Sequence, residues 1–268
     1  MNKKIVFIGS GNMGGAMIGG IVSSLLAKPE DIIASDPSEK ARESLKEKYG
    51  IQVTSDNAKA ASMADILFLA VKPHIYPAAA AQIKDHLKPS AVIVTIAAGQ
   101  TLAHMADLLG EDTKIVRAMP NTPALVGEGM AALCPNKNVT GQEFDEVKSI
   151  FDSFGKSEKI SEDLFDAVVG VSGSSPAYVY MFIEAMADAA VAEGMPRDKA
   201  YVFAAQAVLG SAKMVLETGR HPGDLKDMVC SPGGTTIKAV IALEQTGMRG
   251  SVMQAVQECI DKSKEMSK

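Results

Sequence analysis

The chain has 268 residues, 47% of them hydrophobic and 22% charged, with a formal net charge of −5. That length and apolar content suffice for two domains with ordinary cores. An acidic balance without lysine or arginine runs argues against binding to nucleic acid, and no apolar stretch is long enough to cross a bilayer. Three scattered cysteines without metal-ligand spacing, and no signal-peptide pattern, lead us to expect a reduced cytoplasmic protein that binds neither membranes nor a metal.

The first half of the chain alternates short apolar runs with helical patterns. We predict strands at residues 4–8, 31–35, 65–71, 91–96, 114–119 and 130–134. We predict helices between them at residues 13–26, 39–49, 77–87, 102–109 and 142–154. Alternation of this kind predicts a parallel sheet that helices cover on both faces.

A glycine pattern follows the first predicted strand. Gly9, Gly11 and Gly14 have G-x-G-x-x-G spacing ahead of a helix. In dinucleotide-binding proteins such glycines allow a tight turn, let the pyrophosphate approach the backbone, and let the helix pack on the strand. Asp36 closes the next strand, 22 residues beyond Gly14, where a ribose-binding acid is expected. The context therefore predicts a dinucleotide site rather than a purely structural turn.

Residues after two other predicted strands belong to the same edge of the sheet. Lys72 follows the strand at 65–71, and Ala97 and Ala98 follow the strand at 91–96. Ligands of open α/β sheets bind at the carboxyl ends of the strands, so we expect Lys72 near the cofactor. The small alanines would let a flat ring approach the backbone. A surface lysine at a helix start is the alternative for Lys72.

The second half of the chain reads as helical, at residues 177–193, 197–218 and 235–246, with no predicted strand after about residue 162. The helix at 177–193 is apolar almost all round and has only Glu184 and Asp188 as charges before its end. Such a helix is buried on every side. We predict that a second copy of the chain covers it, with burial against the first domain as the alternative.

A loop rich in glycine and hydroxyl groups opens the last of these predicted helices. Main-chain N–H groups of Gly233, Gly234 and Thr235 combine there with the hydroxyls of Ser231, Thr235 and Thr236. Such a nest suits a carboxylate. A well-capped helix explains the loop equally well.

Taken together, the motifs resemble the pyrroline-5-carboxylate reductase family. The resemblance covers essentially the whole chain in the family's order, and the Ser231–Thr236 segment is its most specific part. The matching segments are residues 7–14, 70–73, 97–99, 117–123, 171–178, 205–207, 210–214, 221–223, 225–227 and 231–236.

The resemblance implies reduction of the cyclic imine 1-pyrroline-5-carboxylate to L-proline, the last step of proline biosynthesis, with NADPH or NADH. It implies an α/β fold with an N-terminal Rossmann-type dinucleotide-binding domain, residues 1–160. A C-terminal all-helical dimerisation and substrate domain would cover residues 161–268. The implied assembly is a homodimer, and larger rings of dimers are common in the family.

The resemblance also implies site residues. The phosphates fall on residues 8–13, the ribose near Asp36 and Asn57, and the nicotinamide near Lys72, Ala97 and Ala98. The full set of cofactor-binding residues is Ile8, Gly9, Ser10, Gly11, Asn12, Met13, Asp36, Asn57, Ala70, Val71, Lys72, Pro73, Ala97 and Ala98. The substrate-binding set is Glu162, Ser231, Gly233, Gly234, Thr235 and Thr236.

The implied chemistry requires mainly that the enzyme position the cofactor and the substrate relative to each other. A protonated imine is already an electrophile, so the reaction requires neither a metal nor a dedicated strong acid. The enzyme must hold the nicotinamide against the imine carbon. The Thr236 hydroxyl is our candidate catalytic group, hydrogen-bonded to the substrate.

One position departs from the family pattern. Members that prefer NADPH often carry a small hydroxyl residue where this chain has Asp36. A carboxylate there would bind a free 2′-hydroxyl and repel a 2′-phosphate. Ser35, Ser38, Lys40 and Arg42 are near enough in sequence to offset that repulsion. We therefore predict that both cofactors work.

Two other functions are alternatives. A β-hydroxyacid dehydrogenase would place a catalytic lysine on a central helix, where this chain has Lys213. Its partner asparagine is missing, because position 217 is Glu217. A nicotinamide-sensing protein without chemistry is the other alternative, but a sensor would not need the carboxylate nest at residues 231–236.

Overall fold

The computed structural model describes residues 1–266, which form two compact units. Residues 1–174 and the segment from Cys259 on make the first unit, and residues 175–258 make the second. The predicted boundary at residue 160 does not coincide with this division, because the following segment packs on the first unit. Phe165 is buried there beside Ala132, and the Ser263 hydroxyl donates a 2.6 Å hydrogen bond to Asp166.

An eight-stranded sheet forms the centre of the first unit, within the described residues, in the order β3-β2-β1-β4-β5-β6-β7-β8. Strands β1 to β6 are parallel, β7 is antiparallel to β6, and β8 is parallel to β7. The order 3-2-1-4-5-6 is that of the Rossmann fold, and it reverses between β1 and β4. The strands are β1 (Ile5–Ile8), β2 (Ile32–Ser35), β3 (Gln52–Thr54), β4 (Ile66–Leu69), β5 (Val92–Thr95), β6 (Lys114–Met119), β7 (Gly129–Pro135) and β8 (Gly155–Lys159).

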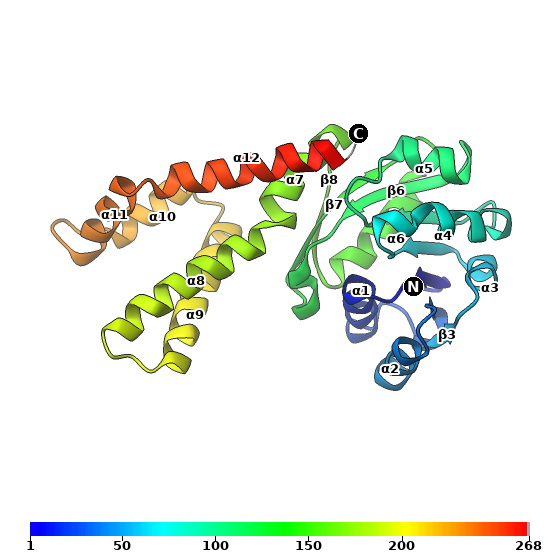
Figure 1. Ribbon diagram of the computed structural model, residues 1–268, viewed down its shortest axis with the longest axis horizontal. Helices are drawn as coiled ribbons and strands as arrows, with labels where there is room; N and C mark the ends of the chain where they lie inside the picture. Colours follow the sequence, from blue (N-terminus) through cyan, green and yellow to red (C-terminus); the bar gives the residue numbers. More distant parts are fainter. Residues whose placement is uncertain (267–268) are drawn as a thin grey trace. The chain divides into compact units, whose positions relative to one another are not determined.

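Helices cover both faces of this sheet (Figure 1). Successive strand residues point to opposite faces, so Phe7 and Phe68 stack on one side while Ile8 and Leu69 belong to the core on the other. The helices of this unit are α1 (Asn12–Ser23), α2 (Glu39–Tyr49), α3 (Asn57–Met63), α4 (Tyr76–Ile83), α5 (Leu102–Leu109), α6 (Gly141–Asp152) and α7 (Phe165–Val168).

The second unit is helical, as predicted, and α8 and α9 pack side by side in it (Figure 1). Its helices are α8 (Ser175–Ala192), α9 (Arg197–Thr218), α10 (Pro222–Val229), α11 (Thr235–Gln245) and the long α12 (Met248–Met266), whose last part belongs to the first unit. Helices α10 and α12 were not among the predicted elements. No helix in residues 1–266 has the length and apolarity that crossing a bilayer requires.

All six predicted strands are confirmed, whereas β3, β8, α3 and α7 were missed. The two missed strands lie at the edges of the sheet and contain the polar sequences Gln-Val-Thr and Gly-Lys-Ser-Glu-Lys. An edge strand that is half exposed lacks the continuous apolar run that marks a central parallel strand. Strand β4 shows that run, and all four of its residues are buried.

Candidate functional site

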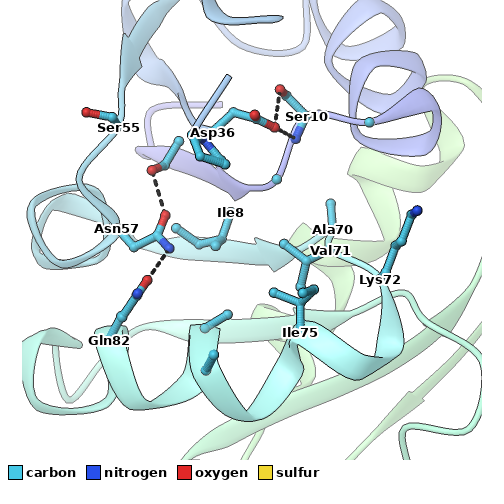
Figure 2. A pocket seen from close by; sticks show the side chains of 16 residues that line it. Ile8, Ser10, Asp36, Ser55, Asn57, Ala70, Val71, Lys72, Ile75 and Gln82 are labelled. Atoms are coloured by element: carbon cyan, nitrogen blue, oxygen red, sulfur yellow. Dashed lines mark hydrogen bonds between the residues drawn. The ribbon is translucent and has the colours of Figure 1, made fainter. Parts of the chain in front are cut away.

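A cavity of about 530 Å³ opens where the strand order reverses (Figure 2). The carboxyl ends of β1, β2 and β4 contribute to it, together with residues of α3 and α4. Nine of the predicted cofactor residues line it: Ile8, Gly9, Ser10, Gly11, Asp36, Asn57, Ala70, Val71 and Lys72. The other five, Asn12, Met13, Pro73, Ala97 and Ala98, are not among the lining residues.

The glycine turn between β1 and α1 leaves the backbone open to this cavity. Gly9 has φ +93°, and a Cβ at that position would lie 2.7 Å from the Ala70 carbonyl oxygen. A Cβ at Gly14 would lie 2.9 Å from the carbonyl oxygen of Gly9, which explains the tight packing of α1 on β1. Around Gly11, the N-cap of α1, a Cβ would meet nothing within 4 Å. The turn therefore leaves open space at the helix N-terminus, where a phosphate is predicted.

Asp36 lies directly after β2 and faces this turn (Figure 2). Its Oδ2 accepts hydrogen bonds from the Ser10 backbone N–H at 2.9 Å and from the Ser10 hydroxyl at 2.7 Å. Its Oδ1 accepts a third from the Ser38 backbone N–H at 2.9 Å. A carboxylate offers about four lone-pair directions, so at least one stays available to a ligand hydroxyl.

Polar side chains continue from Asp36 along the wall of the cavity. The Ser35 hydroxyl donates to the Asn57 side-chain oxygen at 2.6 Å, and the Asn57 amide donates to Gln82 at 2.6 Å (Figure 2). The Arg42 guanidinium donates to the carbonyl oxygens of Asp36 and Pro37. The Arg42 guanidinium therefore contacts the main chain of Asp36 and Pro37 in these two hydrogen bonds.

A buried tyrosine that the sequence reasoning missed joins the ends of β4 and β5. The Tyr76 hydroxyl donates to the Leu69 carbonyl oxygen at 2.7 Å and accepts from the Thr95 hydroxyl at 3.0 Å and the Ile96 N–H at 3.3 Å. Burial raises the pKa of this hydroxyl to about 12, against the opposing effect of its hydrogen bonds. A polar aromatic residue within the apolar pattern at a helix start was the only signal available.

The predicted carboxylate nest lies at the N-terminus of α11, in the second unit. Gly234 is the N-cap, and its N–H donates to the Ser231 carbonyl oxygen at 3.0 Å. This N–H was predicted to be free for a carboxylate, but the turn of the loop uses it. Gly233 has φ +69°, a conformation that favours glycine. Since glycine has no side chain, no side-chain hydrogen bond caps the first turn of α11, which contains Thr235 and Thr236. Binding of the substrate carboxylate there stays a prediction.

Glu162 lies in the first unit and is engaged in a network of its own. Its Oε1 accepts from the Leu102 N–H at 2.7 Å and pairs with the Arg117 guanidinium at 2.9 Å. Arg117 is buried, and its guanidinium carbon lies 4.4 Å from the centre of the Phe165 ring. A contact of Glu162 with the substrate stays a prediction.

The crevice at the reversal of strand order, the open glycine turn and the acid after β2 define a dinucleotide-dependent oxidoreductase. Residues 4–99 match the family described as NADP oxidoreductase, coenzyme F420-dependent, and residues 162–266 match pyrroline-5-carboxylate reductase dimerisation. The chain is 54% identical to pyrroline-5-carboxylate reductase of Escherichia coli over the full length of both proteins. It is 45% identical to that of Methanosarcina acetivorans over 100% of this chain and 99% of the relative.

Solved structures agree with these matches. A pyrroline-5-carboxylate reductase from Coxiella burnetii superposes with a TM-score of 0.94 at 34% identity and covers 100% of both chains. The enzyme from Plasmodium falciparum, a structure with NADP bound, gives a TM-score of 0.90 at 36% identity and covers 100% of this chain and 99% of that one. The chain belongs to the pyrroline-5-carboxylate reductase family of NAD(P)H-dependent oxidoreductases in proline biosynthesis.

Family membership bears on two questions that the sequence left open. The β-hydroxyacid dehydrogenase alternative is set aside, and Lys213 lies 3.4 Å from Glu217 in an exposed ion pair on α9. The second unit carries the family's dimerisation domain, which supports a homodimer. In the single chain α8 is largely uncovered, with Tyr180 60% and Met181 69% exposed.

Proposed function

We propose that the chain reduces 1-pyrroline-5-carboxylate to L-proline by holding two anions at two helix N-termini. The dinucleotide phosphates would lie at the N-terminus of α1 beside Gly11, and the substrate carboxylate at the N-terminus of α11 beside Gly234. The observation that carries this proposal is that both helices begin at a glycine N-cap without a side-chain cap. Each leaves main-chain N–H groups for an anion.

The residues of this chain position the cofactor and the substrate for the reaction. When bound, the dihydronicotinamide supplies a hydride to the carbon of the ring's C=N bond. The first turn of α11 anchors the carboxylate at the other end of that ring, to which the helix dipole contributes about 0.3–1 kcal/mol, and more when partly buried. The Thr236 hydroxyl donates a hydrogen bond to the bound substrate. Lys72, Ala97 and Ala98 form the side of the site against which the nicotinamide lies.

The ribose end of the cavity accepts either cofactor. Asp36 has lone pairs for a free 2′-hydroxyl, which supports NADH. The guanidinium of Arg42 lies against the main chain of Asp36 and offsets part of its repulsion toward a 2′-phosphate. NADPH is therefore used as well, and the balance between the two depends on Asp36.

The homodimer covers α8 and α9. A groove of about 480 Å³ runs between these helices and is lined by Phe182, Met186, Val208 and Val215 among others. Apolar surface of this kind marks a subunit interface. Larger rings of dimers and a cytoplasmic location complete the proposal, the latter supported by the three free cysteines.

Oxidation of NADH and NADPH on addition of pyrroline-5-carboxylate tests the reaction, with a 3-keto acid as the comparison substrate. The imine should cause loss of absorbance at the nicotinamide band and the keto acid should not. Turnover of the keto acid alone would contradict the proposal.

Two matched glycine variants test the cofactor position. Gly11→Ala places a methyl group in open space at the turn, so the fold should persist while the dinucleotide Kd rises about tenfold or more. Gly15→Ala adds the same group four residues further on, about one turn along α1, where the nearest atom is 3.9 Å away. It should leave the Kd within twofold. Equal dinucleotide affinity in both variants would place the cofactor elsewhere.

A further inference from the structure

We propose that Tyr76 is a positioning residue for the nicotinamide half of the cofactor site, acting through its hydroxyl on the ends of β4 and β5. The proposal rests on the proposed function, which places the nicotinamide against residues that follow these two strands. Tyr76 itself is fully buried and is not among the residues that line the cavity.

The hydrogen bonds of the hydroxyl span the two strand ends. It donates to the carbonyl oxygen of Leu69, the last residue of β4. It accepts from the hydroxyl of Thr95, the last residue of β5, and from the N–H of Ile96 beyond it. A tyrosine hydroxyl has one proton and two lone pairs, and all three are used here. One atom thus links the ends of two strands that the sheet already pairs at Leu69 and Thr95.

The ends of β4 and β5 are both followed directly by residues that are predicted to bind the cofactor. Ala70 and Val71 follow Leu69, and a Cβ at Gly9 would meet both of them below 3 Å. The Ala70 N–H also donates to the Ile8 carbonyl oxygen at 2.8 Å. On the other strand, Ile96 is followed at once by Ala97 and Ala98.

The hydroxyl is not needed to fill space. A phenylalanine would occupy almost the same volume among Leu69, Ala79 and Ile83, which belong to the same core cluster. Burying the hydroxyl costs desolvation free energy that only its partners return. Its presence is therefore best explained by the two strand ends that it holds, since a misplacement of about 1 Å can cost a hundredfold in rate.

Tyr76→Phe tests the proposal, with binding of NADH and of ADP-ribose, which lacks the nicotinamide, measured by calorimetry. The Kd for NADH should rise about five- to tenfold and kcat should fall by a similar factor. The Kd for ADP-ribose and the KM for pyrroline-5-carboxylate should stay within twofold. A general structural role would weaken both nucleotides alike, so equal changes, or none, would overturn the proposal.

Two further variants test the proposal independently, in case Tyr76→Phe does not fold. Thr95→Val removes one donor to the tyrosine and should shift NADH affinity in the same direction by two- to fivefold. Thr95→Ser keeps that donor and should bind like the parent chain. If Val and Ser variants bind NADH equally, the proposal fails whatever Tyr76→Phe does.

A remote control and the parent chain complete the design. Ser157→Ala removes another buried hydroxyl, which donates to Asp152 at 2.6 Å, and it should change neither nucleotide. If the Kd for NADH changes as much in Ser157→Ala as in Tyr76→Phe, Tyr76 has no specific role. The parent chain tests the proposed function separately. If the parent neither binds NADH nor oxidises it with pyrroline-5-carboxylate, the proposed function is wrong. The role of Tyr76 is judged only from the differences between the variants and the parent.

Discussion

The Asp36 carboxylate accepts two hydrogen bonds from Ser10, one from its backbone N–H at 2.9 Å and one from its hydroxyl at 2.7 Å. The residue that would meet the ribose is thereby tied to the turn that would meet the phosphates. Because hydrogen bonds from both the main chain and a side chain hold it, the carboxylate is preorganised and its charge has a defined position in the cavity.

Asp36→Ser should shift cofactor use toward NADPH. Removing the negative charge relieves repulsion of the 2′-phosphate, and the new hydroxyl can donate to it. We expect the ratio of kcat/KM for NADPH to that for NADH to rise about tenfold or more in steady-state assays. Asp145→Ser removes an exposed acid on α6 and should leave the ratio unchanged. An unaltered ratio in Asp36→Ser would show that this side chain does not face the ribose.

Thr236→Ala should impair the substrate and spare the cofactor. Loss of a hydrogen bond at the first turn of α11 should raise KM for pyrroline-5-carboxylate or lower kcat by about tenfold, while the Kd for NADH stays within twofold. Thr236→Ser should restore activity. Thr246→Ala, at the opposite end of the same helix, removes a hydroxyl that donates to the Ala242 carbonyl oxygen at 3.0 Å and serves as the control. Unchanged kinetics in Thr236→Ala would remove this residue from the site.

Met181→Glu should weaken the dimer. The side chain is an exposed apolar group on α8, and a charge buried there by a partner would lack compensation. We expect the dimer Kd to rise at least tenfold by sedimentation analysis at several concentrations. Gln142→Glu adds one negative charge at an exposed position of α6 in the first unit and should leave the dimer intact. A Met181→Glu variant that stays fully dimeric would place the interface elsewhere.

The pKa of Tyr76 predicts how stability depends on alkaline pH. Burial raises it to about 12, above the ordinary value of 10.0, so the folded state keeps its proton where the unfolded state loses it. The contribution of Tyr76 to the free energy of unfolding is full below pH 10 and declines as the pH rises from 10 to 12. The loss over that window is roughly 2–3 kcal/mol.

Urea unfolding of the parent chain and of Tyr76→Phe, at pH 9 and at pH 11, measures this contribution. The parent should lose more unfolding free energy than the variant between the two pH values, by roughly 1 kcal/mol. Parallel losses would mean that Tyr76 ionises alike in both states.

The sequence by itself determined the elements and motifs whose signals are local. The spacing of Gly9, Gly11 and Gly14 requires only a strand before it and a helix after it, and both are present. The six apolar strands, the helical second half and the segment 231–236 were likewise readable. Each of these depends on residues within one element or one turn, where periodicity and conformational preference act directly.

Only the tertiary structure decided which distant groups meet. Ser10 donates to Asp36 across 26 positions, and Arg117 pairs with Glu162 across 45. The three hydrogen bonds of the Tyr76 hydroxyl join it to residues 7, 19 and 20 positions away. The edge strands β3 and β8 also escaped prediction, because pairing with β2 and β7 defines them rather than apolar content of their own. Such contacts depend on how the chain packs in three dimensions. Hydrophobic periodicity does not predict which polar groups that packing brings together.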